Sequence, residues 1–390
     1  MKRLKIGIVC HPTYGGSGVV ASELALSLAD RGHELHLFSH EVPPRLARSA
    51  GPVEMHVSQG VPYPLFHSTP HDLAITSRIL SLHRSVGLDI IHAHYALPHA
   101  VSAFLARAAA RADRGRPAPR VVTTLHGTDI TLVGNDPSYQ PLTQFAILAS
   151  DAVTAVSRSL AERTRENFCD EVEPCRIEVI PNFVDLERFH PGAGDLPGRL
   201  SKSGEGPPIV VHVSNFRAVK RVPWLVRAFA LATHGTEAEL VLVGDGPDQD
   251  RCRELARELG LAARVRFLGT RDALPQLLAP ADVFALSSSD ESFGLSALEA
   301  MACATAVVGT AVGGVPEVVT DGVDGLLSAA EDLEGYAEAL RTLLVDRERA
   351  REMGRAARRS AEERFDRRKI VLLYEALYRR LLAEPAEASP

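Results

Sequence analysis

Short apolar runs that are rich in valine and isoleucine alternate with longer segments of helical periodicity along most of the chain. In the first half, a helical segment at 19–31 separates the first two of these runs. Repetition of strand, helix and strand predicts a parallel sheet covered on both faces, complete by about residue 185. The strands expected in this half are residues 6–10, 35–39, 90–92, 121–125, 152–156 and 177–180.

The same alternation restarts after residues 191–208, which are rich in glycine, proline and serine and are typical of a linker. We therefore predict an α/β protein with two Rossmann-like domains, at 1–190 and 205–365, whose sheets point their carboxyl ends at a shared central cleft. Residues 333–383 are helical in pattern, and a helix at about 366–385 is expected to pack back on the first domain. The strands expected in the second half are residues 209–214, 239–243, 265–268, 283–286 and 306–308, with a helix at 221–233.

Composition narrows the class of protein. Of the 390 residues, 45% are hydrophobic and 24% are charged, which is typical of a globular protein. The net charge of -6, without a long basic stripe, argues against binding to nucleic acid. The first apolar run, at 6–10, is too short for a signal peptide, and no stretch approaches the ~20 apolar residues of a membrane span. We expect a cytoplasmic protein that can form a homo-oligomer.

The five cysteines are scattered and lack the Cys-x-x-Cys spacing of zinc sites and redox centres. This pattern argues against a structural zinc site and against a disulfide framework. The cysteines are Cys10, Cys169, Cys175, Cys252 and Cys303.

A glycine-rich loop, HPTYGGSG at 11–18, joins the first expected strand to the first expected helix. Backbone amides converge at such a helix N-terminus, so the loop around Gly16 and Ser17 predicts an anion site. Residues 16–21 also satisfy the dinucleotide fingerprint, with Glu41 at a suitable distance for a ribose contact. An NAD-dependent oxidoreductase is therefore an alternative, although short glycine motifs are weak evidence.

The second half carries cations directly after a strand, in the run SNFRAVKR at 214–221. Asn215, Arg217, Lys220 and Arg221 suit a diphosphate, because they can stabilise the charge that develops when a nucleotide leaves a sugar, without a metal ion. The helix dipole disfavours cations at a helix N-terminus unless an anion binds there. This effect favours an anion site over a merely solvated basic helix start.

Two glutamates eight positions apart define the strongest motif, DESFGLSALE at 290–299. A helix expected to begin near Phe293 and Gly294 would point its free N–H groups, including that of Leu295, at a diphosphate. Glu291 would contact sugar hydroxyls, and Glu299 would accept from ribose hydroxyls. Two further glycine turns, at 313–314 and 244–246, either approach the ligand or serve as structural turns.

His92, His94 and His99 follow an expected strand, and their spacing raises a metal site as an alternative. No neighbouring carboxylate or cysteine completes a ligand set, so hydrogen bonding is the favoured role. The pair Asp248 and Asp250 has an electrostatic reason to lie at a helix start, and we predict no metal site and no cofactor.

Together these motifs resemble the retaining glycosyltransferases of family 4, which have the GT-B fold. The resemblance covers essentially the whole chain and rests on the glutamate pair, on Arg217 and Lys220, on the N-terminal glycine loop and on the segment HGTD at 126–129. It implies a metal-independent sugar transfer from a nucleoside-diphosphate donor. The implied donor-binding residues are Gly16, Asn215, Arg217, Lys220, Glu291, Phe293, Gly294, Leu295 and Glu299.

The runs at 11–18, 92–99, 123–130 and 214–221 are most similar to a branch of this family that acts in bacillithiol biosynthesis. This branch implies UDP-N-acetylglucosamine as donor, L-malate as acceptor and an α-linked product with retained configuration. Catalytic roles then fall to His126, Arg217, Lys220 and Glu291, and same-face attack would send the acceptor proton to the departing phosphate oxygen. The implied acceptor contacts are Ser17, Tyr95, Thr123, Thr124, Asn215 and Arg217.

Three other functions remain open at this point. A family member that uses inositol phosphate would need an additional phosphate site. An oxidoreductase would bind NAD, and a binding module would bind a nucleotide sugar without releasing UDP.

Overall fold

The computed structural model describes residues 2–13, 15–47, 51–61, 69–113, 115–131, 133–169, 175–193 and 206–384. The chain divides into two compact units, of which the first comprises Met1–Pro181 and Arg368–Pro390 and the second Asn182–Arg367. Each unit is an α/β domain with its own parallel sheet. Part of the predicted linker, at 194–205, lies outside the described residues.

The first unit holds a seven-stranded sheet in the order β3-β2-β1-β4-β5-β6-β7, and neighbouring strands pair in parallel. The predicted strands are confirmed to within two residues at either end, and β3 is an addition. Its half-exposed sequence VEMHV lacks the continuous apolar pattern of the central strands. The strands are β1 (Lys5–Val9), β2 (Glu34–Ser39), β3 (Val53–Val57), β4 (Ile90–His94), β5 (Arg120–Leu125), β6 (Ala152–Ala155) and β7 (Ile177–Val179).

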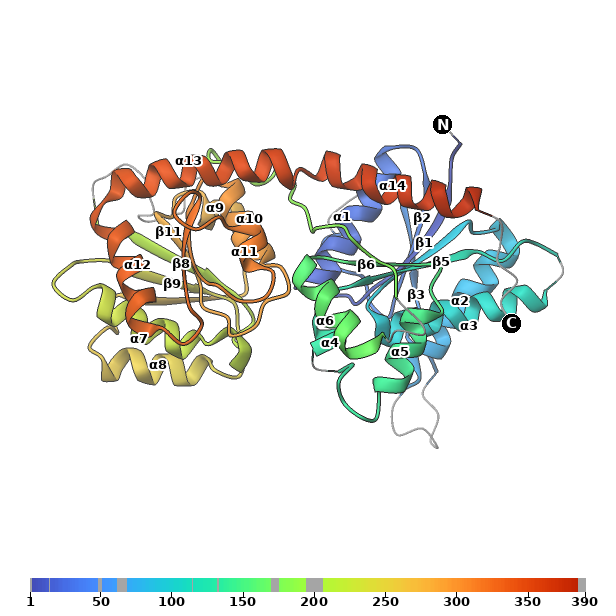
Figure 1. Cartoon of the computed structure of the whole chain (residues 1–390), viewed down its shortest axis with the longest axis horizontal. Coiled ribbons are helices and arrows are strands. Elements are labelled where there is room, and N and C mark those ends of the chain that lie inside the picture. Colours follow the sequence, from blue (N-terminus) through green and yellow to red (C-terminus); the bar gives the residue numbers. More distant parts are fainter. Residues whose placement is uncertain are drawn as a thin grey trace. The chain divides into compact units, whose positions relative to one another are not determined.

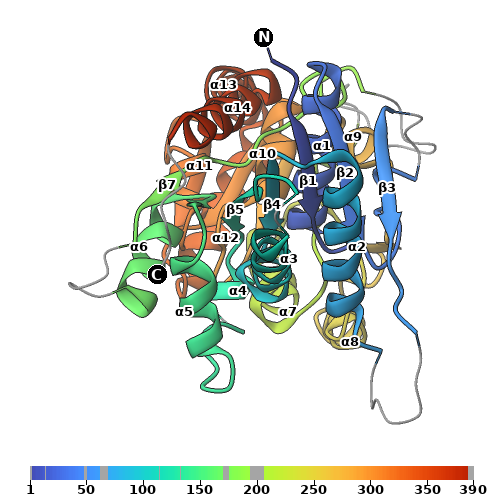
Figure 2. The same cartoon turned by 90° about the vertical axis from the view of Figure 1, so that its right-hand side faces the viewer.

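Helices cover both faces of this sheet. Buried aliphatic side chains of α2, α3 and α5 form one core with the side chains of β1, β2, β4 and β5 that point to that face, and α2 and α3 lie side by side (Figure 2). The opposite face is covered in part by α14. The helical segments are α1 (Gly16–Asp30), α2 (His71–Val86), η1 (Ala96–Ala100), α3 (Val101–Ala112), α4 (Thr128–Thr131), α5 (Gln140–Leu148), α6 (Arg158–Phe168) and α14 (Arg367–Ala383).

Helix α14 packs on the first unit, as the sequence pattern predicts. Its buried residues Ile370, Tyr374, Leu377, Tyr378 and Leu381 recur at helical spacing, which creates one apolar face. The Tyr378 hydroxyl lies 2.7 Å from Nδ1 of His92 in β4.

A buried carboxylate also fastens α14 to the first unit. Glu375 is 5% exposed, and it accepts from Nε of Arg31 at 2.6 Å and from Nη2 of Arg379 at 2.6 Å. Burial alone would raise the pKa of Glu375, but the hydrogen bonds to Arg379 and Arg31 outweigh it and hold the pKa at about 2. The carboxylate is therefore charged throughout the physiological pH range.

The second unit holds a six-stranded sheet in the order β10-β9-β8-β11-β12-β13, again paired in parallel. The five predicted strands are present, and β13 is an addition. Strands β8 and β11 lie at the centre and are almost wholly buried, which explains their unbroken apolar sequences. The strands are β8 (Ile209–Val213), β9 (Glu239–Val243), β10 (Val265–Gly269), β11 (Val283–Leu286), β12 (Ala306–Thr310) and β13 (Gly325–Ser328).

Helices also cover both faces of the second sheet, with α7, α8 and α12 on one face and α10 and α13 on the other (Figure 1). The tail after Asp332 forms three helices, in agreement with its predicted helical pattern. The helical segments are η2 (Ala218–Lys220), α7 (Val222–Ala232), α8 (Gln249–Glu258), α9 (Leu274–Leu278), α10 (Leu295–Ala302), α11 (Val315–Val318), α12 (Leu333–Val345) and α13 (Arg347–Arg364).

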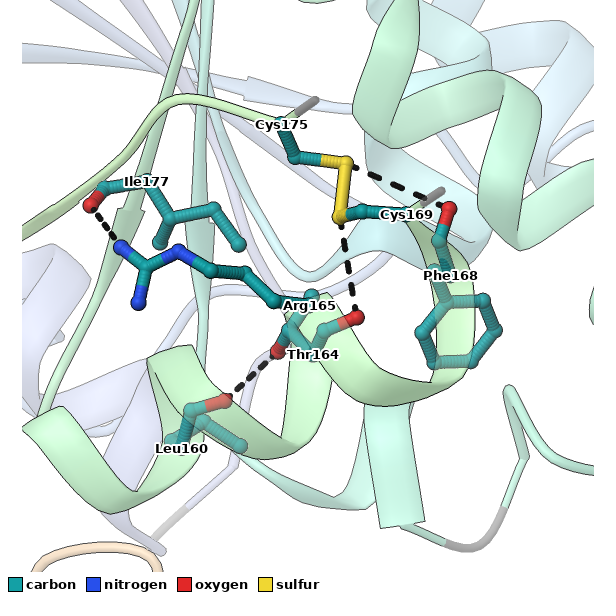
Figure 3. Close-up of a disulfide and its surroundings, with 7 residues drawn as sticks. All are labelled: Leu160, Thr164, Arg165, Phe168, Cys169, Cys175 and Ile177. Atoms are coloured by element: carbon teal, nitrogen blue, oxygen red, sulfur yellow. Dashed lines mark hydrogen bonds between the residues drawn. A yellow bond between two sulfur atoms is a disulfide. The ribbon is translucent and has the colours of Figure 1, made fainter. Parts of the chain in front are cut away.

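The prediction against a disulfide is wrong at one place. Cys169, which follows α6, and Cys175, which precedes β7, form a disulfide, and their Cα atoms are 5.6 Å apart (Figure 3). A hydrogen bond from Arg165 Nη2 to the Ile177 carbonyl oxygen, at 2.9 Å, joins the same two elements. The spacing of six residues gave no sign of the pairing, because it depends on how the end of α6 and the start of β7 meet in the fold. Cys10, Cys252 and Cys303 are free and buried.

Within the described part of the chain, no helix is both long enough and apolar enough to span a bilayer.

Replacement of Glu375 by alanine should lower the free energy of unfolding by about 2 kcal/mol, because it leaves Arg31 and Arg379 without their buried partner. Both arginines are partly exposed, which keeps the effect below that of a fully buried pair. Urea denaturation at pH 7 measures the change. Glu348→Ala, which removes two exposed ion pairs on α13, is the control and should lower the free energy of unfolding clearly less. Equal losses in the two variants would contradict this account.

Candidate active site

The predicted donor residues of the second unit gather after the central strands β8 and β11. Lys220 lies at the end of the turn η2, which follows β8, and Glu291 lies in the loop that follows β11. Nζ of Lys220 donates to Oε2 of Glu291 at 2.5 Å, and both side chains are largely buried, with 19% and 15% exposed. Two residues 71 positions apart, each predicted to contact a substrate, therefore form one ion pair.

A run of serines fixes the turn that carries Lys220. The Ser287 hydroxyl donates to the carbonyl oxygen of Lys220 at 2.8 Å. The backbone N–H of Ser289 donates to the carbonyl oxygen of Val219, also at 2.8 Å. The Ser288 hydroxyl donates to Oε2 of Glu291 at 3.1 Å. These bonds explain why serines follow β11. They fix the backbone that carries Lys220 and the carboxylate of Glu291, so that the two side chains meet.

The glycine turn at 313–314 supports the Glu291 loop from the other side. The backbone N–H of Gly314 donates to the Glu291 carbonyl oxygen at 2.8 Å. Gly313 has φ +51, and a Cβ at this position would overlap that same carbonyl oxygen. Of the two roles that the sequence left open, the structure supports a structural turn, and this turn positions Glu291.

Asn215 and Arg217 project from the loop between β8 and η2. Both residues are exposed, whereas Phe216 between them is fully buried. The Phe216 backbone is held by the turn after β9, since its N–H donates to Asp245 and its carbonyl accepts from Asp248, both at 2.9 Å. Gly244 permits this close approach, because a Cβ there would overlap the carbonyl oxygen of Ser214.

The third cation of this run, Arg221, does not join Lys220. Its Nε donates to the Ser287 carbonyl oxygen at 3.0 Å, its Nη1 pairs with Glu331 at 2.9 Å, and its guanidinium lies over the Trp224 ring at 4.4 Å from the centroid. Arg221 is therefore engaged by other protein groups than Lys220 is, and its predicted contact with a diphosphate stays a prediction.

Helix α10 begins at Leu295, one residue later than predicted, with Gly294 as its N-cap at φ +93. No side chain caps this end, so the N–H groups of its first turn point outward without an intrahelical acceptor. Phe293 is 3% exposed and packs edge-on against Phe365. Glu299, one turn further along α10, is 6% exposed.

His212 in β8 is a site neighbour that the sequence analysis did not identify. Its Nδ1 bonds to the Ala285 carbonyl oxygen at 2.8 Å and its Nε2 to the Ser214 hydroxyl at 2.7 Å. Burial lowers the pKa of His212 to about 4, and the nearby Lys220 adds to this effect. A single histidine inside a continuous apolar run carries no signal that distinguishes such a role.

In the first unit, the glycine loop leads from β1 into α1. The N-cap is Gly15, no side chain caps the helix, and the first turn carries no acidic residue. Gly16 is exposed and Ser17 is 8% exposed. Tyr14 lies outside the described residues.

A chain of polar side chains crosses the ends of β4 and β5. Nε2 of His92 lies 2.7 Å from the Thr124 hydroxyl, which in turn lies 2.7 Å from the Thr154 hydroxyl. Next to it, Nδ1 of His94 lies 2.9 Å from Nε2 of His126. His92 and His94 are thus hydrogen-bonding residues, as predicted, and their ring nitrogens do not converge on a shared metal position.

His126 and Tyr95 lie at the outer end of this chain. Both are partly exposed, and their rings stack with centroids 5.5 Å apart. The buried Asp129 carboxylate fixes the loops that carry them, because it accepts from the backbone N–H groups of Ala96, His126 and Gly127. Asp129, the acidic residue of the HGTD segment, therefore has a structural role.

Thr123 and Thr124, predicted as acceptor contacts, are both fully buried. The Thr123 hydroxyl bonds to that of Ser150 at 2.8 Å, on the opposite face of the sheet from Thr124. In this structure, their hydroxyls support neighbouring elements.

The imidazoles of His92, His94 and His126 are neutral at pH 7. Desolvation of the rings lowers the pKa of His92 and of His126 to about 3, and it lowers the pKa of His94 well below its ordinary value. Since His94 Nε2 has no partner among the described residues, we assign the shared proton to His94 Nδ1, which leaves an acceptor rather than a donor unpaired. His126 then carries its own proton on Nδ1, where it can donate to a ligand.

Comparison with known proteins identifies the class of this chain. The model of glycosyltransferase family 4 matches residues 14–188, and that of the glycosyl transferases group 1 matches residues 200–360. The glycosyltransferase from Rickettsia africae shares the fold, with a TM-score of 0.79 and 21% identity over 99% of this chain and 100% of that one. The chain belongs to the family-4 glycosyltransferases, and the predicted GT-B fold is confirmed.

Two curated relatives are similar over most of their length. The N-acetyl-alpha-D-glucosaminyl L-malate synthase of Bacillus anthracis is 43% identical, over 96% of this chain and 97% of the relative. The D-inositol 3-phosphate glycosyltransferase of Salinispora tropica is 32% identical, over 89% of this chain and 77% of the relative. This membership assigns the N-terminal glycine loop to a glycosyltransferase and replaces the NAD-dependent alternative.

The buried histidines predict a loss of stability in acid. A histidine whose pKa is lowered by folding contributes stability above its ordinary pKa of 6.5, and this stability is lost as the pH falls toward its folded pKa of about 3. For fully buried His92 the slope is about 1.4 kcal/mol per pH unit.

Urea denaturation at pH 7.5 and pH 5.5 tests this expectation on the intact protein and on His92→Gln, whose amide can still meet Tyr378 and Thr124. The variant should lose about 1 kcal/mol less than the parent between the two pH values. The same pH dependence in both proteins would show that His92 is not buried in its neutral form.

Proposed function

We propose that this enzyme transfers N-acetylglucosamine from UDP-N-acetylglucosamine to the hydroxyl group of L-malate, with retention at the anomeric carbon. The observation that carries the proposal is the 43% identity to the Bacillus anthracis malate synthase over almost the whole of both chains. The inositol phosphate relatives are only 31–33% identical. A place in bacillithiol synthesis and a cytoplasmic location belong to the same proposal.

The second unit supplies the donor site in this proposal. The open N-terminus of α10, at Gly294 and Leu295, binds the diphosphate through its free N–H groups and its dipole. Arg217 and Lys220 add positive charge where the leaving phosphate becomes more negative. Glu291 accepts from sugar hydroxyls and Glu299 from the ribose hydroxyls.

The ion pair between Lys220 and Glu291 prepares this site. Glu291 is held by Lys220 and by Ser288, and Lys220 is held by Glu291, so little side-chain entropy remains to be lost when the donor binds. Because the acceptor lone pairs of Glu291 and the remaining N–H groups of Lys220 are not all used within the pair, both can bind substrate without separating.

The first unit supplies acceptor contacts. Malate has two carboxylates and one nucleophilic hydroxyl, so its site needs N–H and O–H donors. The uncapped start of α1 at Gly16 and Ser17, the Tyr95 hydroxyl and the Nδ1 proton of His126 meet this need. Gly16 also remains a proposed donor contact, and Asn215 and Arg217 remain proposed contacts to both substrates.

Thr123 and Thr124 take a supporting role in the proposal. Their buried hydroxyls fix β5, which ends next to His126, and Thr124 also orients His92. They act on the acceptor through the backbone and through His126.

The reaction then proceeds on one face of the sugar. The bond between the anomeric carbon and the phosphate oxygen breaks, the malate hydroxyl oxygen bonds to the same carbon, and the departing phosphate oxygen takes the hydroxyl proton. Lys220, Arg217 and the α10 N-terminus stabilise the charge on the phosphate, so no step requires a metal ion.

The release of UDP from UDP-N-acetylglucosamine should depend on L-malate and should continue at the same rate in the presence of EDTA. A coupled assay for UDP, run with and without malate and chelator, measures both dependences. Malate-independent release, or loss of release with EDTA, would contradict the acceptor or the metal-free mechanism respectively.

The same assay separates the two candidate acceptors. D-inositol 3-phosphate in place of malate should give no UDP above background. Turnover with inositol phosphate but not with malate would assign this chain to the function of the more distant relatives.

Lys220→Met and Glu291→Gln should each lower kcat about 100-fold or more, because each removes a group that acts on the transition state. Steady-state kinetics measure the loss, and circular dichroism checks that the variants are folded. Glu254→Ala, on the exposed face of α8, is the matched control and should keep full activity. Undiminished turnover in both site variants would remove Lys220 and Glu291 from the site.

A further inference from the structure

Three potential metal ligands lie together at the edge of the first sheet, on strands β2 and β3. The parallel register pairs His36 with Glu54 and Phe38 with His56, so His36, Glu54 and His56 point to the same face. Within the described residues, their ligand atoms lie within 4.8 Å of one another. None of the three takes part in the proposed sugar transfer.

The distances between these atoms match those of a tetrahedral metal site. Nδ1 of His36 lies 3.1 Å from Nε2 of His56, and the Glu54 carboxylate oxygens lie 3.4 Å from the first nitrogen and 3.6 Å from the second. Ligands at the usual zinc distances of 2.0–2.2 Å are separated by about 3.3–3.5 Å in a tetrahedron. Two imidazoles and one carboxylate can therefore supply three of its corners, and a water molecule would supply the fourth.

The surroundings of His36 also suit a bound metal ion. Oε1 of Glu34 lies 3.2 Å from Nε2 of His36, the nitrogen on the far side of the ring from the cluster. A carboxylate in this position orients a ligating imidazole and makes it more basic. The two histidines are 2% exposed and are held in place, whereas Glu54 is exposed and gives an ion access.

Among the described residues, Arg78 of α2 makes a contact that opposes metal binding. Its Nε and Nη2 lie 3.3 and 3.2 Å from Nδ1 of His56, so this nitrogen accepts and the ring proton lies on Nε2. A metal ion on Nε2 requires the proton to move to Nδ1, and the exposed Arg78 side chain must then turn away. Loss of the Arg78 side chain should therefore strengthen metal binding.

We propose that His36, Glu54 and His56 form a binding site for a zinc-class divalent ion, which fastens the edge strand β3 to β2. The ligand set of two imidazoles and one carboxylate favours zinc over magnesium or calcium, which prefer oxygen ligands. The site serves stability rather than sugar transfer, so it is compatible with turnover in EDTA.

Metal-free full-length protein titrated with Zn²⁺ should bind one equivalent at this site and show a higher Tm in its presence. Co²⁺ in place of Zn²⁺ should give the visible absorption bands of a tetrahedral site. Glu54→Gln should weaken Zn²⁺ binding at least about 10-fold without affecting the fold, since the side chain is exposed. His36→Gln and His56→Gln should abolish the cobalt spectrum.

Arg78→Gln should tighten Zn²⁺ binding about two- to fivefold, as expected for the removal of an exposed opposing charge. His234→Ala, at an exposed histidine of the second unit, is the control for adventitious surface binding and should change nothing. Unchanged zinc affinity in Glu54→Gln, or no zinc bound by the parent protein, would overturn the proposal. A loss of binding in the His234 variant would place the ion elsewhere.

Discussion

Every strand in both sheets runs parallel to its neighbours, and this constraint decides where the chemistry of the chain can lie. Parallel strands buried on both faces must be apolar along their length, so polar functional groups are confined to the loops at their ends. Residues far apart in the sequence, such as Lys220 after β8 and Glu291 after β11, thereby become neighbours. The glycine turns and the serine run serve this arrangement, since they allow the loops to approach closely and they satisfy the backbone groups at the strand ends.

The exceptions to the apolar rule are informative. His92, His94 and His212 lie inside buried strands, and each has at least one ring nitrogen bonded to another protein group. Burial keeps these imidazoles neutral, which lets them orient neighbouring groups without adding charge to the interior. In the first unit this network leads from Tyr378 of the last helix to Thr124 in β5, and so ties the C-terminal segment to the strand that precedes His126.

The sequence was sufficient to predict the fold class, the parallel order of the elements and most strand positions, because continuous apolar runs leave few alternatives. It missed β3 and β13, whose short, half-exposed strands have no such pattern. Lys220 and Glu291 were both predicted as donor contacts from their places after strands, but their ion pair and the diversion of Arg221 to Trp224 and Glu331 depend on tertiary contacts. The disulfide and the His36–His56 cluster also arise from tertiary proximity, for which residue spacing gives no evidence.

The central claim is that this glycosyltransferase makes an α-linked glycoside of L-malate. Proton NMR of the product isolated from UDP-N-acetylglucosamine, L-malate and the purified enzyme tests this claim most directly. The account predicts a single N-acetylglucosaminyl malate whose anomeric proton has the small coupling constant of an α-glycoside. A β-linked product, or the absence of any sugar attached to the malate hydroxyl, would contradict it.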